Sequence, residues 1–126
     1  MEIIKKQINK NLIKINLGTD LNTETSDVIG SVELDIETQA QFIEMITVLL
    51  EAKNLYIILD MSNISYIDSS GLWSLFESQK KAEQKYGKIV LLNPTKDVAR
   101  VLDVTKMSTK INVFTNETDA IKSFPS

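Results

Sequence analysis

The sequence predicts an α/β fold, in which a mixed, mostly parallel sheet of about four or five strands is combined with about four helices. Two strand-like runs open the chain, and helical patterns then alternate with apolar strand-like runs to its end. The links between these patterns are short, as in compact α/β units. A strand–helix–strand unit needs a crossover connection, which makes its strands parallel. With 126 residues the chain is long enough for one domain with a real core and too short for two.

The first third of the chain is predicted to contain a hairpin, a loop and a helix. Residues 3–8 and 12–17 alternate in the manner of strands around an Asn-rich turn, which favours an antiparallel hairpin. Residues 18–25 are polar and form a loop, and residues 28–34 contain a short edge strand. Asp35 or Thr38 then caps the first helix, which ends near Lys53 and Asn54. The apolar face of that helix is formed by Phe42, Ile43, Ile46, Leu49 and Leu50.

A buried strand at residues 55–59 leads into the segment that concerns function. A polar turn follows at residues 60–63, and the chain then reaches Asp68, Ser69, Ser70 and Gly71, where a second helix begins. Gly87 ends this helix. Its residues at i, i+3 and i+4 spacing, predicted to form one apolar face, are Leu72, Leu75, Phe76, Gln79, Ala82 and Tyr86.

The last third continues the alternation of strands and helices. Residues 88–92 form a buried strand, and Asn93, Pro94 and Thr95 form a turn that starts a helix at residues 96–104. Residues 105–109 are polar, residues 111–114 form a short last strand, and a terminal helix starts near residue 115 and runs to about Phe124.

The composition excludes several classes of function. Without cysteine or histidine the chain has no disulfide, no zinc site of the thiolate or imidazole type, and no Ser-His-Asp or Cys-His catalytic set. A formal net charge of −3 and the lack of a clustered basic face argue against nucleic-acid binding. No segment resembles a signal peptide or a membrane span, so we expect a cytoplasmic protein that inserts into no membrane. We expect no enzymatic activity, no metal and no cofactor.

The serine pair at the start of the second helix has two compatible interpretations. Asp and Ser are good N-cap residues, because their oxygens accept hydrogen bonds from the unpaired N–H groups of the first turn. Capping alone accounts for the pattern. A serine hydroxyl at this place is also a candidate phosphorylation site, because a phosphate there lies beside those N–H groups and the positive end of the helix dipole.

Asp60 and Trp73 are two further candidates. Asp60, at the end of a buried strand, is compatible with a phosphoaspartate receiver, but that fold also needs an early acidic pair for a magnesium ion, and Asp20 stands alone. A serine hydrolase is less favoured still, because the G-x-S-x-G elbow is missing. Trp73 lies off the centre of the apolar face, so its ring either covers the edge of the core or is exposed as an interface anchor.

These segments resemble the STAS domains and, within them, the anti-sigma factor antagonists. The hallmark of the family is a strand ending in LDLS, a short loop, and DSSGL or DSTGL at the start of a helix; this chain has ILDMS at residues 58–62 and YIDSSGL at residues 66–72. The similarity extends to ELD at residues 33–35 and GKIVLLN at residues 87–93. The whole chain, 1–126, is then a single STAS domain, with N-terminal strands and a variable loop at 1–32 and the best-matching core at 33–124.

The resemblance implies a partner-switching function. Such proteins bind an anti-sigma factor that is also a serine kinase and thereby release a sigma factor, which regulates transcription. The kinase phosphorylates the serine after the motif aspartate, here Ser69, and a metal-dependent serine/threonine phosphatase reverses the modification. The partner-binding residues implied by the resemblance and by the sheet edge are Asp68, Ser69, Ser70, Gly71, Trp73, Asn93 and Thr95.

The chain also departs from the family pattern. It has extra residues between Leu17 and Glu33, a bulky Trp73 where a small residue is usual, and Thr105, Lys106 and Met107 where the family often has TGL. A second function from another class therefore stays open. In it, the chain is a STAS scaffold or an accessory subunit of a membrane transport or signalling complex, without control of a sigma factor.

Overall fold

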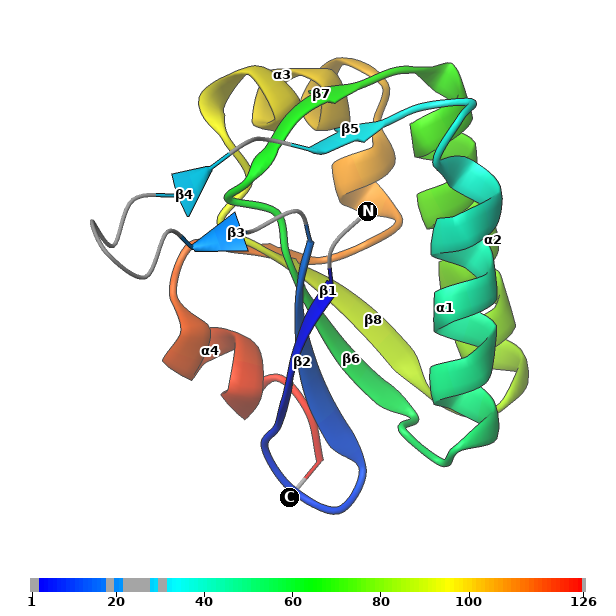
Figure 1. Cartoon of the computed structure of the whole chain (residues 1–126). Helices are drawn as coiled ribbons and strands as arrows, with labels where there is room; N and C mark the ends of the chain where they lie inside the picture. The colour runs from blue at the N-terminus through cyan, green and yellow to red at the C-terminus, as the bar shows by residue number, and fades with distance from the viewer. Residues whose placement is uncertain (1–2, 18–19, 22–27, 30–31, 126) are drawn as a thin grey trace.

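A computed structural model describes residues 3–17, 20–21, 28–29 and 32–125 (Figure 1). Its centre is a five-stranded sheet with the strand order β1-β2-β6-β8-β9. The two N-terminal strands, β1 (Ile3–Gln7) and β2 (Leu12–Leu17), pair antiparallel. The following neighbours, β6 (Tyr56–Asp60), β8 (Lys88–Leu92) and β9 (Val113–Phe114), continue the sheet with parallel pairing. The predicted α/β class, the hairpin and the mostly parallel sheet are confirmed.

The helices cover the sheet on two faces. In Figure 1, α1 (Gln39–Glu51) and α2 (Ser69–Gln84) pack side by side on the right of the sheet, and α4 (Glu117–Lys122) lies on the left. At the top, α3 (Lys96–Val104) is followed by the short 3₁₀ helix η1 (Met107–Thr109). Within the described part of the chain no helix is long and apolar enough to cross a membrane.

The alternation of side chains along the strands divides the core into two clusters. Ile57 and Leu59 of β6 face the larger cluster, which contains the apolar residues of α1, α2 and α3. Ile58, between them, faces the smaller cluster under α4, where Phe124 packs against the ring of Tyr56 with centroids 5.2 Å apart. Both faces of the central strands are therefore buried, which explains why their sequences are continuous apolar runs.

Two small sheets were not predicted from the sequence. β3 (Asp20–Leu21) pairs antiparallel with β4 (Val28–Ile29). The region predicted as a loop and one edge strand thus contains several short strands; most of the predicted loop at 18–25 lies outside the described residues. β5 (Val32–Leu34) pairs parallel with β7 (Ile64–Ile67) above the main sheet. β7 was missed because a four-residue run is too short for its periodicity to distinguish it from a loop.

The buried face of α2 also differs from the prediction. Phe76 is 39% exposed and Tyr86 is 90% exposed, whereas Ser74 and Ser78 are buried. Burial of Ser74 costs little because its hydroxyl donates to the carbonyl of Gly71 at 2.6 Å. Small residues lie on this face, and a hydropathy pattern counts serine as polar wherever it sits. The prediction is confirmed for Leu75, Gln79 and Ala82, which are buried, and for Leu72, which packs against the core, but it is wrong for Phe76 and Tyr86.

The ends of α1 and α2 use left-handed residues that the sequence did not identify. Lys53 (φ 71°) and Tyr86 (φ 62°) adopt this conformation, rather than Asn54 or Gly87. Asn54 is buried instead, and its side-chain oxygen accepts a hydrogen bond from Gln7 at 2.8 Å. Gly87 is needed for space, because a Cβ there would lie 2.2 Å from the carbonyl oxygen of Leu55.

Candidate functional site

The end of β7 delivers Ser69 to the start of α2. Pairing of β7 with β5 sets Ile67 opposite Leu34, and the N–H of Asp68 donates to the carbonyl of Leu34 at 3.3 Å. The chain then turns directly into the helix, whose first residue is Ser69. Its side chain is exposed, while Ser70 is half-buried. The candidate phosphorylation site thus lies on a short, paired backbone rather than at the tip of a long loop.

Asp68 is the residue that caps α2. Its backbone is extended, and its Oδ1 accepts a hydrogen bond from the N–H of Gly71 at 3.0 Å. The capping interpretation is therefore correct for Asp68. Ser69 follows the cap, and its hydroxyl makes no assigned hydrogen bond within the described chain. This hydroxyl is free to react without loss of the cap.

Gly71 fixes the helix start against β5. A Cβ at this position would lie 2.1 Å from the carbonyl oxygen of Leu34 and 2.8 Å from Cγ1 of Ile67. No side chain fits in this space, so glycine permits the close approach of the helix backbone to the strand. Together with the cap, this contact holds the first turn of α2 in one position.

The electrostatic surroundings of Ser69 combine one favourable and one unfavourable element for a phosphate. The first-turn N–H groups of a helix have no partners within the helix, and they carry the positive end of its dipole. α2 is 16 residues long, and its first turn has no acidic residue. The carboxylate of Asp68, immediately before Ser69, would repel the added charge. A phosphate on Ser69 would be held by backbone dipoles and remain exposed.

Exposed apolar side chains lie near Ser69. Trp73, one helical turn further along, is 51% exposed, so its ring is not buried in the core, and its role as an interface anchor stays a prediction. Tyr66 is 51% exposed on β7, and Ile36 is 68% exposed two residues beyond the pairing partner of Ile67. Neither Tyr66 nor Ile36 was predicted from the sequence; the burial pattern of β7 is buried, exposed, exposed, buried, so no simple alternation marks Tyr66 as exposed.

Thr95 lies at the other end of β7, and Asn93 lies at the end of β8. Asn93 is exposed and left-handed (φ 52°), and its N–H donates to the carbonyl of Phe114 at 2.7 Å. Thr95 caps α3 by accepting from the N–H of Val98 at 3.3 Å, and its hydroxyl lies 3.4 Å from the carbonyl of Ile64. Ser69 lies five positions after Ile64 along an extended chain, a separation of roughly 16 Å. The structure brings Asp68, Ser69, Ser70, Gly71 and Trp73 together at the start of α2, whereas Thr95 contacts the first residue of β7 and Asn93 follows β8.

Asp60 is engaged in structural contacts. Its Oδ1 accepts hydrogen bonds from the backbone N–H of Ser62 at 2.9 Å and from the Ser62 hydroxyl at 2.7 Å. Its other oxygen lies 3.7 Å from Nζ of Lys14. Among the described residues there is no group of three acidic side chains that could hold a metal ion. Asp60 thus stabilises the turn after β6, which is the arrangement expected of a structural aspartate.

The fold and this helix start define a small α/β domain with an exposed serine motif. The chain matches the model of the STAS domain over residues 6–120 and belongs to this family. It is 24% identical over 118 residues to the anti-sigma F factor antagonist of Paenibacillus polymyxa, a match that covers 94% of this chain and 91% of the relative.

Solved structures agree with this fold. The anti-sigma factor antagonist SpoIIAA in its unphosphorylated form has a TM-score of 0.71 and 20% identity, with 99% of this chain and 100% of that chain covered. The Bacillus cell fate determinant SpoIIAA in the phosphorylated form has a TM-score of 0.65 and 18% identity, with 98% and 100% covered. At these identities the likeness concerns the fold alone.

Proposed function

We propose that this protein is an anti-sigma factor antagonist whose binding is switched by phosphorylation of Ser69. The observation that carries the proposal is the exposed Ser69 hydroxyl, which follows the capping residue Asp68 and has exposed apolar side chains beside it. Membership of the STAS family and a curated relative named as an anti-sigma F factor antagonist support it. The protein acts as a binding module in the cytoplasm, and the sigma factor is released when its antagonist occupies the anti-sigma factor.

The modification is a phosphoryl transfer from ATP bound to the anti-sigma factor, which is also a serine kinase. The Oγ of Ser69 forms a bond to the γ-phosphorus, the bond from that phosphorus to the bridging oxygen breaks, and ADP leaves; a base of the kinase takes the hydroxyl proton. A metal-dependent phosphatase hydrolyses the phosphoserine and restores the hydroxyl. The chain itself supplies only the acceptor and its presentation.

The physical reason for switching is charge at the centre of a docked surface. Phosphorylation adds about −1.5 to −2 charges at pH 7 next to Asp68. A partner that buries Trp73 and Ser69 would have to remove this charge from water. Burial of an unpaired charge is strongly unfavourable, so the complex dissociates.

Intact-mass measurement after incubation with ATP and the candidate serine kinases encoded in the same genome tests the acceptor. We expect one added phosphate on the wild-type chain and on Ser70→Ala, and none on Ser69→Ala. Ser70→Ala is the matched control, because it removes a hydroxyl from the same helical turn. A phosphate that persists on Ser69→Ala would assign the site to another residue.

Binding titrations of Ser69→Asp and Ser69→Ala test the switch. Ser69→Ala should bind the kinase like the wild type, because it removes no contact of the fold. Ser69→Asp should bind more weakly, with a partial effect, since one charge replaces the −1.5 to −2 of a phosphate, about half to two thirds of it. Isothermal titration calorimetry measures both dissociation constants, and equal affinities would remove charge as the cause.

A further inference from the structure

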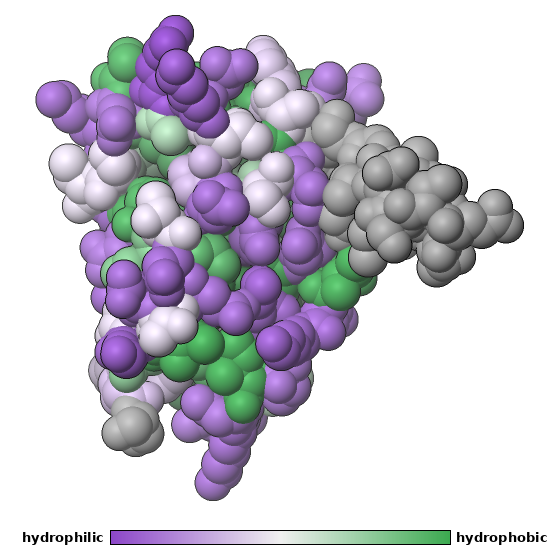
Figure 2. Space-filling view, turned by 90° about the vertical axis from the view of Figure 1, so that its left-hand side faces the viewer, coloured by the Kyte–Doolittle hydropathy of each residue, from purple (hydrophilic) through white to green (hydrophobic). Residues whose placement is uncertain are grey.

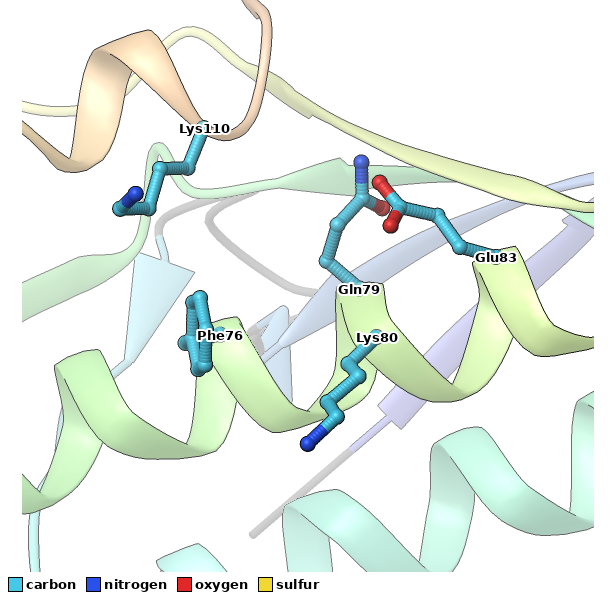
Figure 3. Close-up of a pocket in the computed structure, with 5 residues that line it drawn as sticks. All are labelled: Phe76, Gln79, Lys80, Glu83 and Lys110. Carbon is cyan, nitrogen blue, oxygen red and sulfur yellow. The ribbon is translucent and has the colours of Figure 1, made fainter.

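A hollow of about 410 Å³ lies beside the C-terminal half of α2, on the edge of the sheet that carries β9 (Figure 3). β6 pairs along all of β8, but on the opposite side β9 pairs only with Leu91 and Leu92, which leaves the first half of β8 without a strand on that side among the described residues. The residues that line the hollow are Phe76, Gln79, Lys80, Glu83 and Lys110. Nothing in the function proposed above uses this hollow.

The hollow adjoins the same face of α2 that presents Ser69. Residues at i, i+4, i+7 and i+11 lie on one face of a helix, and here they are Ser69, Trp73, Phe76 and Lys80. All four are exposed. Phe76 lies about 10 Å along the helix from Ser69, at about 1.5 Å per residue. A partner that covers Ser69 and Trp73 can therefore reach the hollow without leaving the helix.

Gln79 forms the floor of the hollow, and the two N–H groups of its side-chain amide are available as hydrogen-bond donors. Its side chain is only 7% exposed, and its Oε1 accepts the N–H of Ile89 at 2.8 Å, where the next strand would otherwise bind. This contact fixes the side-chain amide, and its Nε2 has no assigned acceptor within the described chain. A held amide with free N–H groups is suited to a carbonyl oxygen.

The opposite wall combines a ring and a cation. Nζ of Lys110 lies 6.0 Å from the centroid of the Phe76 ring. In Figure 3 Gln79 and Glu83 extend together from one end of the hollow, while Lys80 points away from them. The wall at Phe76 and Lys110 thus offers an apolar surface and a positive charge, and Glu83 at the far end would repel a second acidic group.

We propose that this hollow is a second docking site for the anti-sigma factor and binds a segment of that partner. An apolar side chain of the segment packs on Phe76, a carboxylate pairs with Lys110, and a main-chain carbonyl accepts a hydrogen bond from the amide of Gln79. The inference rests on the proposed function for the identity of the partner. Charge and donor complementarity select a peptide with one acidic residue. A nucleotide is disfavoured, because Glu83 shares the hollow and Lys80 turns outward.

Titration of the full-length chain with the kinase that phosphorylates Ser69 tests the second site. Lys110→Glu and Phe76→Ala should each weaken binding by at least about tenfold, as for anchor residues of an interface. Lys10→Glu is the matched control: it makes the same change of net charge on an exposed lysine at the hairpin turn, outside the hollow, and it should change binding by less than about twofold. Urea unfolding of each variant verifies that the fold is intact.

A second readout examines the floor directly. In the ¹⁵N-labelled wild-type chain, the side-chain amide signals of Gln79 should shift when the kinase is added, and they should stay unshifted in Lys110→Glu at the same kinase concentration. The second site would be overturned if Lys110→Glu and Phe76→Ala bound the kinase with wild-type affinity and the Gln79 signals of the wild-type chain did not shift. The Ser69 switch would remain intact. Absence of binding by any candidate kinase to the wild type would overturn the proposed function and this inference with it.

Discussion

At the scale of single residues, Gly71 and Asp68 decide where the candidate phosphoacceptor sits. Asp68 was identified from the sequence because its short acidic side chain before a helix is a strong local signal. The need for glycine at position 71 could not be predicted from the sequence. Its neighbour, the carbonyl of Leu34, is 37 positions away in the chain and is brought close only by the pairing of β5 with β7. Local chemistry can be predicted from sequence, whereas such long-range contacts cannot.

Substitution of Gly71 by alanine should destabilise the fold. The new Cβ would start 2.1 Å from the Leu34 carbonyl oxygen, so strand or helix must move. We expect a loss of about 1–3 kcal/mol, as for overpacked positions. Urea unfolding at equilibrium measures it, with Ser70→Ala in the same turn as the control, within about 0.5 kcal/mol of the wild type. If Gly71→Ala unfolded at the same urea concentration as the wild type, strand and helix would be shown to move apart at no cost in stability.

Trp73→Ala should separate folding from recognition. Its side chain is 51% exposed, so we expect the free energy of unfolding to change by no more than about 0.5 kcal/mol, as for surface positions. Binding of the kinase should lose upward of roughly 1–2 kcal/mol, as for an anchor residue. Urea unfolding and calorimetric titration of this one variant measure the two quantities. A stability loss of about 3–5 kcal/mol would instead indicate a core residue.

At the scale of elements, the accuracy of the sequence predictions followed the strength of the local signal. The bounds of α3, at residues 96–104, were predicted correctly, because Pro94 and the capping Thr95 mark its start and its apolar residues recur regularly. The existence of α2 and part of its buried face, Leu75, Gln79 and Ala82, were predicted, but Ser74 and Ser78 were missed because small hydroxyl residues carry no apolar signal. Which face of a helix is buried depends on its neighbours, and these are set by the whole fold.

The docking of α4 on the sheet should depend on pH. Nζ of Lys14 lies 2.7 Å from the carboxylate of Glu117, the first residue of α4. The hydrogen bond from Lys14 lowers the pKa of Glu117 from its ordinary value of 4.5; burial opposes this shift, and the charges of Lys14 and Lys6 add to it. A lowered pKa in the folded state means that the stabilisation is present above the unfolded pKa and is lost as pH falls through the folded one.

Comparison of wild type with Glu117→Gln detects this contribution. The side chain of Glu117 is 36% exposed, so solvent screening limits the stabilisation to at most about 1 kcal/mol. The difference in free energy of unfolding between the two proteins should be present at pH 7 and should vanish once the pH is well below 4.5. Urea unfolding over this range measures it. A difference that stays constant with pH would mean that the ion pair contributes nothing.

At the scale of the whole molecule, the two sides of the sheet are unequally covered. The larger core cluster lies under α1, α2 and α3, and the smaller one lies under α4, a helix of six residues. The view from the α4 side shows a mainly hydrophilic surface with smaller hydrophobic areas between the polar groups (Figure 2). So short a helix is not stable on its own in water and depends on this limited contact.

Hydrogen exchange of the native protein should therefore show two levels of stability. Backbone amides in β6 and β8, which are buried on both faces, should exchange only through global unfolding. Amides of α4 should exchange through local opening, with an opening free energy at least about 2 kcal/mol below the global value. Exchange followed by NMR at increasing low urea concentrations distinguishes the two. Equal opening energies would make α4 part of a single cooperative unit.

The contact of Gly71 with the Leu34 carbonyl also bears on how the domain can carry a signal. The backbone of Gly71 lies so close to the Leu34 carbonyl that no Cβ fits between them, so we expect this helix start to keep its shape when Ser69 is modified. Under the proposed switch, the two states of the protein then differ in the charge of the Ser69 side chain, and a partner distinguishes them through direct contact with that side chain. Exposed residues such as Trp73 and Tyr66 can be substituted without disturbing the fold. The same fold can therefore bind different partners through changes at its surface.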